Sequence, residues 1–499
     1  MKISNCVTKD LFICIVIVAT GTAAAAAAAA AAEAGGGSKA NNVAAFHVPT
    51  GERQLFLDNY GIASIRDLTR TMHKPTKKGA VICPDPVKGG SFWIHTAPFW
   101  VPEEKVFKVL VGSTTGPTRW YVSVDGLRWT AGQKPNQEKF SVVYDTRDPD
   151  PARRYKGLSP DTWHGDSWHG ECTGGFYVSP DGIDWTRIKF PGVPSQDMHS
   201  LSFDERGRMF LMVAKRRGPY GRAHGLLTST DFENWTEPML VFEADDLDQK
   251  IGLKNIEARR ADTSLQQVVS DDPSYYNVDI YNMGVFRYES LYIGTPVMYH
   301  ATGPSADGNN TDGFKLIQLS CSRDLKHWQR VADRKTFLGP SLLGSGAYDL
   351  TGLLGPSRAV IRGDELWFYY TGAKYRRPPT RAEPDAGAVC LAVLRRDGFV
   401  SLDSGQQAGT MLTRPFKLHG DKLFVNVDAP QGELRVEAID HHGRVVARSE
   451  PLQGDLLGAL VNWTQGDLED LKGQSVCLRF TSREAQLYSY WVENSLVKN

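Results

Sequence analysis

From about residue 45 onward, short runs of apolar and aromatic residues are separated by polar stretches rich in Gly, Asp and Pro. Examples are 106–114 (VFKVLVGST), 209–217 (MFLMVAKRR) and 365–373 (ELWFYYTGA). Short apolar and aromatic runs are typical of β-strands, and the residues between them are typical of turns. The pattern predicts an all-β protein.

A seven-residue motif, Ser-x-Asp-x-x-x-Trp, follows four of these strand-like runs. The copies are Ser123-Asp125-Trp129, Ser179-Asp181-Trp185, Ser229-Asp231-Trp235 and Ser322-Asp324-Trp328. In a tight turn the Asp can accept backbone amides, Gly or a polar residue can take the unusual backbone angle, and the Trp can pack on the next strand. Four copies at identical spacing predict a repeated antiparallel sheet, the unit of a β-propeller.

The strand-like runs group into five such sheets between residues 45 and 410, although six blades remain possible. The last blade carries Leu394–Phe399 (LRRDGF) in place of the motif, and the run 53–64 (RQLFLDNYGIAS) is expected to close the ring. After residue 411 six alternating runs lack the motif, which predicts a β-sandwich over 411–499. Packing against the propeller is its favoured role, with glycan binding as the alternative.

The N-terminus has the pattern of a secretory signal peptide. Lys2 and Lys9 precede an apolar run, 11–20, and an alanine tract that ends at Ala32-Glu33-Ala34. We expect a signal peptide over 1–34, a flexible linker over 35–44, and a secreted or periplasmic protein. A membrane anchor is the alternative, but the strongly apolar run is about half of the ~20 residues that span a bilayer.

Composition narrows the range of partners. Lys+Arg 57 and Asp+Glu 57 give a net charge of zero, so the chain lacks the basic excess of nucleic-acid-binding proteins. The five cysteines after the leader are scattered, without the spacing of a disulfide framework or a zinc site. We expect a carbohydrate partner, no nucleic acid, and no membrane in the mature form.

Several segments resemble secreted bacterial proteins described as glycoside hydrolase family 32-like, and more distantly the propellers of families 32 and 43. They are the stretches FLDNY, NVDIYNMGVFRYESLYIG, GAYDLTGLLGPSRAV and LAVLRRDGFVSLD, at residues 56–60, 277–294, 346–360 and 391–403. The resemblance implies a five-bladed propeller with a pocket on its axis, lined by carboxylates that act on a glycosidic bond.

Family 32 enzymes carry an Asp nucleophile, an Arg-Asp-Pro stabiliser and a Glu-Cys general acid, in that order. In this chain Asp58 stands at the first position without the family's following Pro-Asn-Gly, Asp148 stands in a literal Arg-Asp-Pro, and Glu171 precedes Cys172. The Gly- and His-rich surroundings of Glu171 predict a solvated position on the rim of the pocket.

Glycosidic cleavage needs one protonated and one ionised carboxyl group. In a propeller these should stand near the starts of inner strands, and the candidates are Asp58, Asp148 or its neighbour Asp145, Asp197, Asp279 and Asp349. A single Asp more often caps a turn. Asp58 and Asp279 stand in apolar strands, where an unpaired carboxylate is costly, and they are the preferred pocket acids.

Substrate contacts are expected from residues near the same strand starts. They are Trp93, which could stack on a sugar or pack in the core, and His95, His199, Tyr281 and Asn282 as polar neighbours. The loop 163–170 repeats Trp-His-Gly and suits a binding rim better than a metal site, because its spacing is not that of zinc ligands. No metal or cofactor is expected. The basic runs 215–217 and 376–377 are expected to be solvated surface runs, with binding of an anionic sugar as the alternative.

Two functions compete. The first is a secreted glycoside hydrolase that acts on a poly- or oligosaccharide through the pocket carboxylates. The second is a non-catalytic propeller that binds a glycan or a protein on the same face, which the departure from the family pattern at Asp58 favours.

Overall fold

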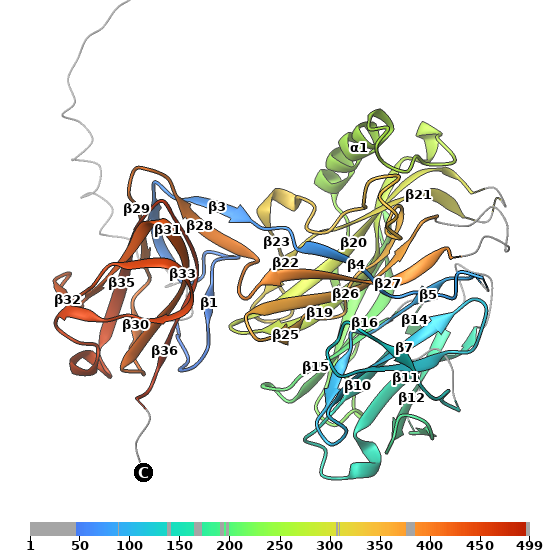
Figure 1. The fold of residues 1–499 in the computed structure, drawn as a ribbon, viewed down its shortest axis with the longest axis horizontal. Helices are drawn as coiled ribbons and strands as arrows, with labels where there is room; N and C mark the ends of the chain where they lie inside the picture. Colours follow the sequence, from blue (N-terminus) through green and yellow to red (C-terminus); the bar gives the residue numbers. More distant parts are fainter. Residues whose placement is uncertain are drawn as a thin grey trace, which may run out of the picture. The chain divides into compact units, whose positions relative to one another are not determined.

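The computed structural model describes residues 46–495 except 88, 137–140, 164–171, 190–193, 196–198, 306–307, 309 and 376–384. The predicted signal peptide and linker lie outside these residues, as do Glu171 and Asp197. Within them the chain folds into five sheets of four or five strands and a further twelve-stranded sheet (Figure 1). The predicted all-β fold, a five-bladed β-propeller with a C-terminal β-sandwich, is confirmed.

The blades follow one another along the chain. Blade 1 contains β5 (Phe92–Trp93), β6 (Phe99–Val101), β7 (Val106–Ser113), β8 (Arg119–Ser123) and β9 (Thr130–Ala131). Blade 2 contains β10 (Ser141–Tyr144), β11 (Tyr155–Trp163), β12 (Cys172–Ser179), β13 (Thr186–Arg187) and β14 (Pro194–Ser195). Blade 3 contains β15 (His199–Asp204), β16 (Met209–Gly218), β17 (Gly221–Ser229) and β18 (Met239–Phe242).

Blade 4 follows α1 (Asp246–Ala261) and contains β19 (Asn277–Tyr288), β20 (Leu291–Pro304), β21 (Thr311–Ile317), β22 (Ser320–Ser322) and β23 (Gln329–Arg330). Blade 5 contains β24 (Gly352–Leu354), β25 (Val360–Arg362), β26 (Glu365–Ala373), β27 (Gly387–Arg395) and, from the other end of the chain, β4 (Thr76–Ile82).

The ring is closed by β4, which pairs with β27 and lies beside it in Figure 1. The prediction that the run 53–64 closes the ring is wrong, because β1 (Gln54–Leu55) and β2 (Ile62–Arg66) pair with β36 and β29 of the twelve-stranded sheet. The closing strand has an open outer edge, so polar residues such as Lys77 and Lys78 are tolerated there and it lacks the apolar pattern of an inner strand.

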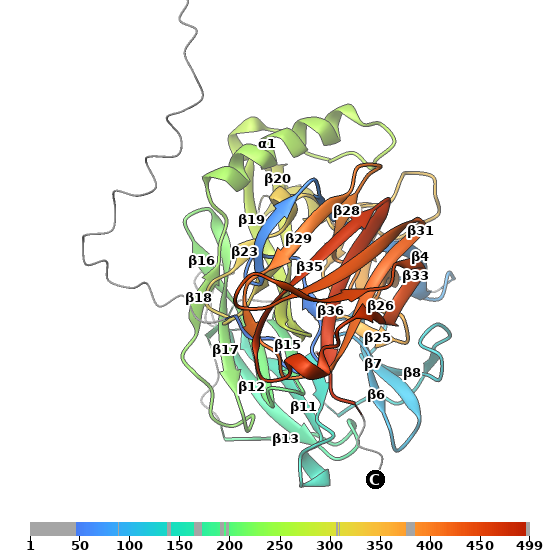
Figure 2. The same cartoon turned by 90° about the vertical axis from the view of Figure 1, so that its left-hand side faces the viewer.

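The twelve-stranded sheet draws its strands from both ends of the chain, and Figure 2 looks onto it. Besides β1 and β2 it contains β3 (Thr69–Met72), β28 (Val400–Ser404), β29 (Gly409–Thr413), β30 (Phe416–Lys417), β31 (Lys422–Ile439), β32 (Val445–Ser449), β33 (Leu452–Leu460), β34 (Trp463–Gln465), β35 (Ser475–Arg483) and β36 (Ala485–Glu493). The expected boundaries at residues 45 and 410 therefore do not coincide with the sheets. Its buried side chains share one hydrophobic core with blades 4 and 5.

The four repeat motifs form four equivalent turns in four different blades. In each, the Asp carboxylate accepts two backbone amides and the Trp indole donates to the carbonyl three residues earlier. Each Trp belongs to a different hydrophobic cluster, as expected for separate blades. One detail of the prediction is wrong. The residue after the Asp has positive φ in every turn, and in two turns it is apolar, Phe232 and Leu325, because its side chain packs in the blade core.

The propeller axis has two ends. The inner strands are β10, β15 and β19 in blades 2 to 4, β5 continued by β6 in blade 1, and β24 continued by β25 in blade 5, since each of these two pairs of short strands lies against one neighbour, β7 or β26. We call the end where they begin the entry end and the end where they finish the far end. Between them the axis is narrow: Ser357 accepts the amide of Ala97, Thr96 accepts that of Val142, and the void beside these residues is only about 10 Å³. The two ends are separate surfaces.

A buried histidine beneath α1 should make stability depend on pH. The Nε2 of His300 bonds to the Asn255 amide at 3.0 Å and its Nδ1 to the carbonyl of Met298 at 3.3 Å, which fits the neutral ring. Burial lowers the pKa of His300 to about 4. The unfolded chain, with a pKa near 6.5, therefore binds a proton before the folded chain does, so stability falls as pH drops from about 6.5 to 4.

We expect this histidine to contribute about 3 kcal/mol to the loss of stability over that interval. Urea unfolding at pH 7 and pH 4.5 should show a smaller difference for His300→Gln than for the parent protein. His441→Gln, which removes an exposed histidine, serves as the matched control and should keep the full difference. An unchanged pH dependence in His300→Gln would contradict the assignment.

Candidate active site

Asp279 lies near the start of the inner strand β19, at the entry end, and is only 5% exposed. Nη1 of Arg222 donates to its two oxygens at 3.0 and 2.9 Å, and the Arg222 amide donates at 3.2 Å. The close approach requires glycine at 221, since a Cβ there would lie 2.7 Å from the carboxylate at a φ of 116°. Burial raises the pKa of Asp279, and the charge and hydrogen bonds of Arg222 reduce this rise without cancelling it.

Tyr281, two residues further along β19, lies among three cationic side chains. Its ring centroid is 3.4 Å from Nζ of Lys315, 4.7 Å from Nζ of Lys215 and 5.4 Å from Cζ of Arg222. The ring of Tyr299 lies 6.2 Å away. Among the described residues, three cationic side chains and the carboxylate of Asp279 thus surround one aromatic ring.

The expectation that the basic run 215–217 lies on the solvated surface is wrong for Lys215. Lys215 is 2% exposed, whereas Arg217 is exposed. Lys215 and Arg217 share one face of β16, but Lys215 lies 4.7 Å from the ring centroid of Tyr281, whereas Arg217 is nearer the strand end and is exposed. The second run, 376–377, lies outside the described residues.

Asn282 follows a β-bulge between Ile280 and Asn282 that places one extra residue, Tyr281, in β19. Asn282 is 8% exposed, and its Oδ1 has no hydrogen-bond donor among the described residues. A buried acceptor without a partner costs about 1–3 kcal/mol. A ligand hydroxyl at this position would remove that cost.

The other predicted contact residues also lie near the starts of inner strands. His199 is the first residue of β15 and is buried, and Trp93 ends the short strand β5 and is half-buried. The Trp93 ring lies against Gly112, where a Cβ would come within 2.4 Å of it. His95 follows two residues later and is also half-buried. Their roles in binding stay predictions.

Asp58 is not at the entry end, and the prediction that it points into the axial pocket is wrong. It follows β1 of the twelve-stranded sheet and accepts two hydrogen bonds from Arg323, at 2.8 and 3.1 Å. Arg323 stands in the fourth repeat turn, at the far end, and its guanidinium lies 4.4 Å from the ring of Tyr60. Burial of Asp58 is therefore explained by an ion pair within the fold.

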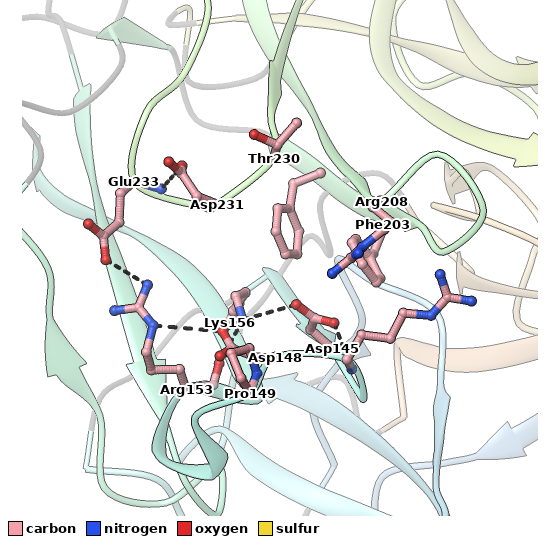
Figure 3. A pocket seen from close by; sticks show the side chains of 12 residues that line it. Asp145, Asp148, Pro149, Arg153, Lys156, Phe203, Arg208, Thr230, Asp231 and Glu233 are labelled. Carbon is pink, nitrogen blue, oxygen red and sulfur yellow. Dashed lines mark hydrogen bonds and ion pairs between the residues drawn. The ribbon is translucent and has the colours of Figure 1, made fainter.

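Asp148 also lies at the far end, because it follows the finish of the inner strand β10 (Figure 3). Lys156, 1% exposed, donates to Asp148 at 2.6 Å and to Asp145 at 3.3 Å. Burial is the largest single influence and raises the pKa of Asp148, but Lys156, the Asp150 amide and Arg153 together outweigh it, so that the net shift is downward. The literal Arg-Asp-Pro match is thus a loop that neutralises a buried lysine, and its placement in the axial pocket is wrong.

Asp349 precedes β24 and is 2% exposed. Its Oδ2 lies 2.7 Å from Nζ of Lys77 on the closing strand and accepts the Tyr370 hydroxyl at 2.8 Å. These bonds direct the carboxylate into blade 5 and fasten β4 to the propeller. Of the five predicted acids, Asp279 and Asp349 stand at the starts of inner strands, and the contacts with Lys77 and Tyr370 hold Asp349 within blade 5. Asp197 lies outside the described residues.

No protein-family model and no curated protein matches the sequence. Similar solved structures include a family 32 β-fructofuranosidase from Bombyx mori, with 11% identity over 82% of this chain and 95% of that chain, at a TM-score of 0.38. The catalytic domain of a family 62 α-L-arabinofuranosidase from Coprinopsis cinerea has 12% identity over 64% and 97% of the two chains, at a TM-score of 0.40. An N-acetylgalactosamine deacetylase from F. plautii has 11% identity over 67% and 97%, at 0.38. Likenesses this remote do not assign a reaction to this chain.

Three residues of the site were not predicted from the sequence: Arg222, Tyr299 and Lys315. Lys315 carried a usable signal, because it interrupts an otherwise apolar stretch, as Asp279 does. Arg222 stands just after a tight turn, where a basic residue is ordinarily solvated.

No α-helix in the described part of the chain is long and apolar enough to cross a membrane.

Proposed function

We propose that this protein binds a saccharide at the entry end of the propeller and cleaves a glycosidic bond there. The observation that carries the proposal is that one strand, β19, holds two buried acceptors: the carboxylate of Asp279 and Oδ1 of Asn282, which has no hydrogen-bond donor among the described residues. A polyhydroxylated ligand supplies hydrogen-bond donors to both acceptors.

Asp279 suits the part of the ionised carboxylate. It accepts two hydrogen bonds from one guanidinium, and a carboxyl group in that arrangement is an acceptor rather than a proton donor. It would stabilise positive charge on the sugar ring or activate the attacking group. We propose Asp197, which precedes β15 in the sequence, as the protonated partner.

A non-catalytic glycan-binding propeller is the second candidate. Three of the predicted catalytic acids, Asp58, Asp148 and Asp349, each form an ion pair with a basic side chain of the protein itself. Their structural role favours this second candidate. Binding without cleavage needs only the acceptors, the ring and the cations of the entry end.

The two candidates are separated by incubating the purified protein with neutral and acidic polysaccharides and measuring new reducing ends. Hydrolysis predicts reducing ends without the absorbance of an unsaturated uronate near 235 nm. Asn282→Leu, which keeps the volume and removes the acceptor, should weaken substrate use at least tenfold. Affinity for a saccharide without any cleavage supports the second candidate, and neither binding nor cleavage across the panel would contradict both.

A further inference from the structure

The far end of the axis contains a cavity of about 770 Å³ that none of the functions above uses. It is lined where the inner strands finish, by residues of all five blades. Those that matter below are Trp100, Glu205, Arg206, Arg287, Arg358 and Arg362. The axis is narrow at Ser357 and Thr96, where the void is only about 10 Å³, and this narrow part lies between the cavity and the entry end.

Two of its arginines have no carboxylate partner among the described residues. Arg358 donates from Nη2 to the carbonyl of Pro98 at 3.1 Å, and Arg362 from Nη2 to the carbonyl of Asp125 at 3.5 Å. Burial lowers the pKa of Arg358, and the charge of Glu205 only partly opposes this. By contrast, Arg287 in the same cavity is paired with Glu52.

The Arg362 guanidinium is held in place by aromatic rings. It lies 4.9 Å from the ring centroid of Phe107 and 5.6 Å from that of Trp367. A guanidinium fixed in this way keeps its remaining N–H groups in a defined geometry, which favours planar anions such as carboxylates.

An exposed aromatic ring lies beside these cations. Trp100 is 40% exposed and packs edge-on against Phe107 at 4.9 Å, and the neighbouring strand β25 exposes Ile361 to 47%. Trp100 and Ile361 both line the cavity, so exposed apolar surface lies beside its arginines. Sugar rings present one apolar face that packs on such a ring.

We propose that the far-end cavity is a second binding site, for an acid-bearing saccharide unit such as a hexuronate. The acid group is bound by Arg358 and Arg362, and the sugar ring packs on Trp100. The site does not depend on catalysis at the entry end. It would hold a second stretch of an acidic polysaccharide on the same molecule, and so increase the time that the chain stays on its polymer.

Calorimetric titration of the full chain with tetragalacturonate, and with maltotetraose as the neutral match, tests the proposal. Arg358→Gln and Trp100→Ala should each weaken tetragalacturonate binding at the far end at least tenfold, and 0.5 M NaCl should weaken it in the parent protein. Both changes are made in a protein that also carries Tyr281→Ala, which weakens saccharide binding at the entry end, so that the titration reports binding at the far end. Arg128→Gln, an exposed arginine in the first repeat turn, is the matched control and should change nothing.

Trp100 is exposed, so its truncation should leave the melting temperature within a few degrees of the parent and keep the test valid if Arg358→Gln does not fold. Unchanged affinity in Trp100→Ala and in folded Arg358→Gln overturns the proposal, and so does equal affinity for maltotetraose. Binding of tetragalacturonate at the far end by a parent protein that cleaves none of the saccharides tested would instead overturn the proposed function alone. A sulfated tetrasaccharide as a further ligand distinguishes a sulfate from a carboxylate.

Discussion

Replacing Asp397 with alanine is expected to lower the free energy of unfolding by about 3–5 kcal/mol. Asp397 is fully buried at the turn that leads from blade 5 into β28. Its carboxylate is 2.5 Å from Arg53 and accepts the hydroxyls of Tyr288 and Ser489, both at 2.6 Å, and the amide of Asn426 at 3.0 Å. The change leaves a cation and three donors without their acceptor.

The partners of Asp397 come from parts of the chain that are remote in sequence. Arg53 precedes β1, Tyr288 ends β19 of blade 4, and Ser489 lies on β36. Loss of the carboxylate should therefore weaken the attachment of the twelve-stranded sheet to blades 4 and 5 rather than one element. Guanidinium chloride unfolding followed by far-UV circular dichroism measures the loss.

Two further variants isolate the cause. Residue 397 has a φ of 63°, which asparagine tolerates better than alanine does, so Asp397→Asn removes the charge with less backbone strain. Asp455→Ala breaks the exposed ion pair with Arg395 and should cost less than about 1 kcal/mol. If Asp397→Ala also lowers the free energy of unfolding by less than about 1 kcal/mol, the contacts of the Asp397 carboxylate do not stabilise the fold.

The propeller could be predicted because its signal is local and repeated. A turn of seven residues determines its own hydrogen bonds, so Ser229, Asp231 and Trp235 have the same contacts in the structure as their counterparts in three other blades. Ring closure could not be predicted in the same way. The pairing of β4 with β27 joins residues more than 300 positions apart, and an outer strand has no apolar alternation to reveal it.

The site was only partly predictable, for an electrostatic reason. A carboxylate in an apolar strand must have a partner, but the sequence does not show whether that partner is a ligand or a distant side chain. Asp58 and Asp279 look alike in sequence, and both accept two hydrogen bonds from one arginine. Only the fold shows that one pair lies beside the fourth repeat turn and the other at the entry end.

This likeness makes Asp58→Asn the matched control for Asp279→Asn. Each change removes one charge from a buried Asp–Arg pair, so each should lower the free energy of unfolding by about 3 kcal/mol. The two variants should differ in activity, because Asp279 alone lies beside Tyr281, Asn282 and the cations of the entry end.

Asp279→Asn is expected to reduce saccharide cleavage at least about 100-fold, since the amide keeps the shape but neither accepts a proton nor stabilises a cationic sugar. Asp58→Asn should retain turnover within about twofold of the parent, measured per folded molecule at a temperature below both melting transitions. Single-turnover rates at saturating substrate separate loss of chemistry from loss of binding. Equal losses in both variants would mean that activity follows stability alone, and full activity in Asp279→Asn would remove Asp279 from the active site. If Asp279 is a catalytic carboxylate, Asp279→Asn must still bind the saccharide while its single-turnover rate of cleavage is lost.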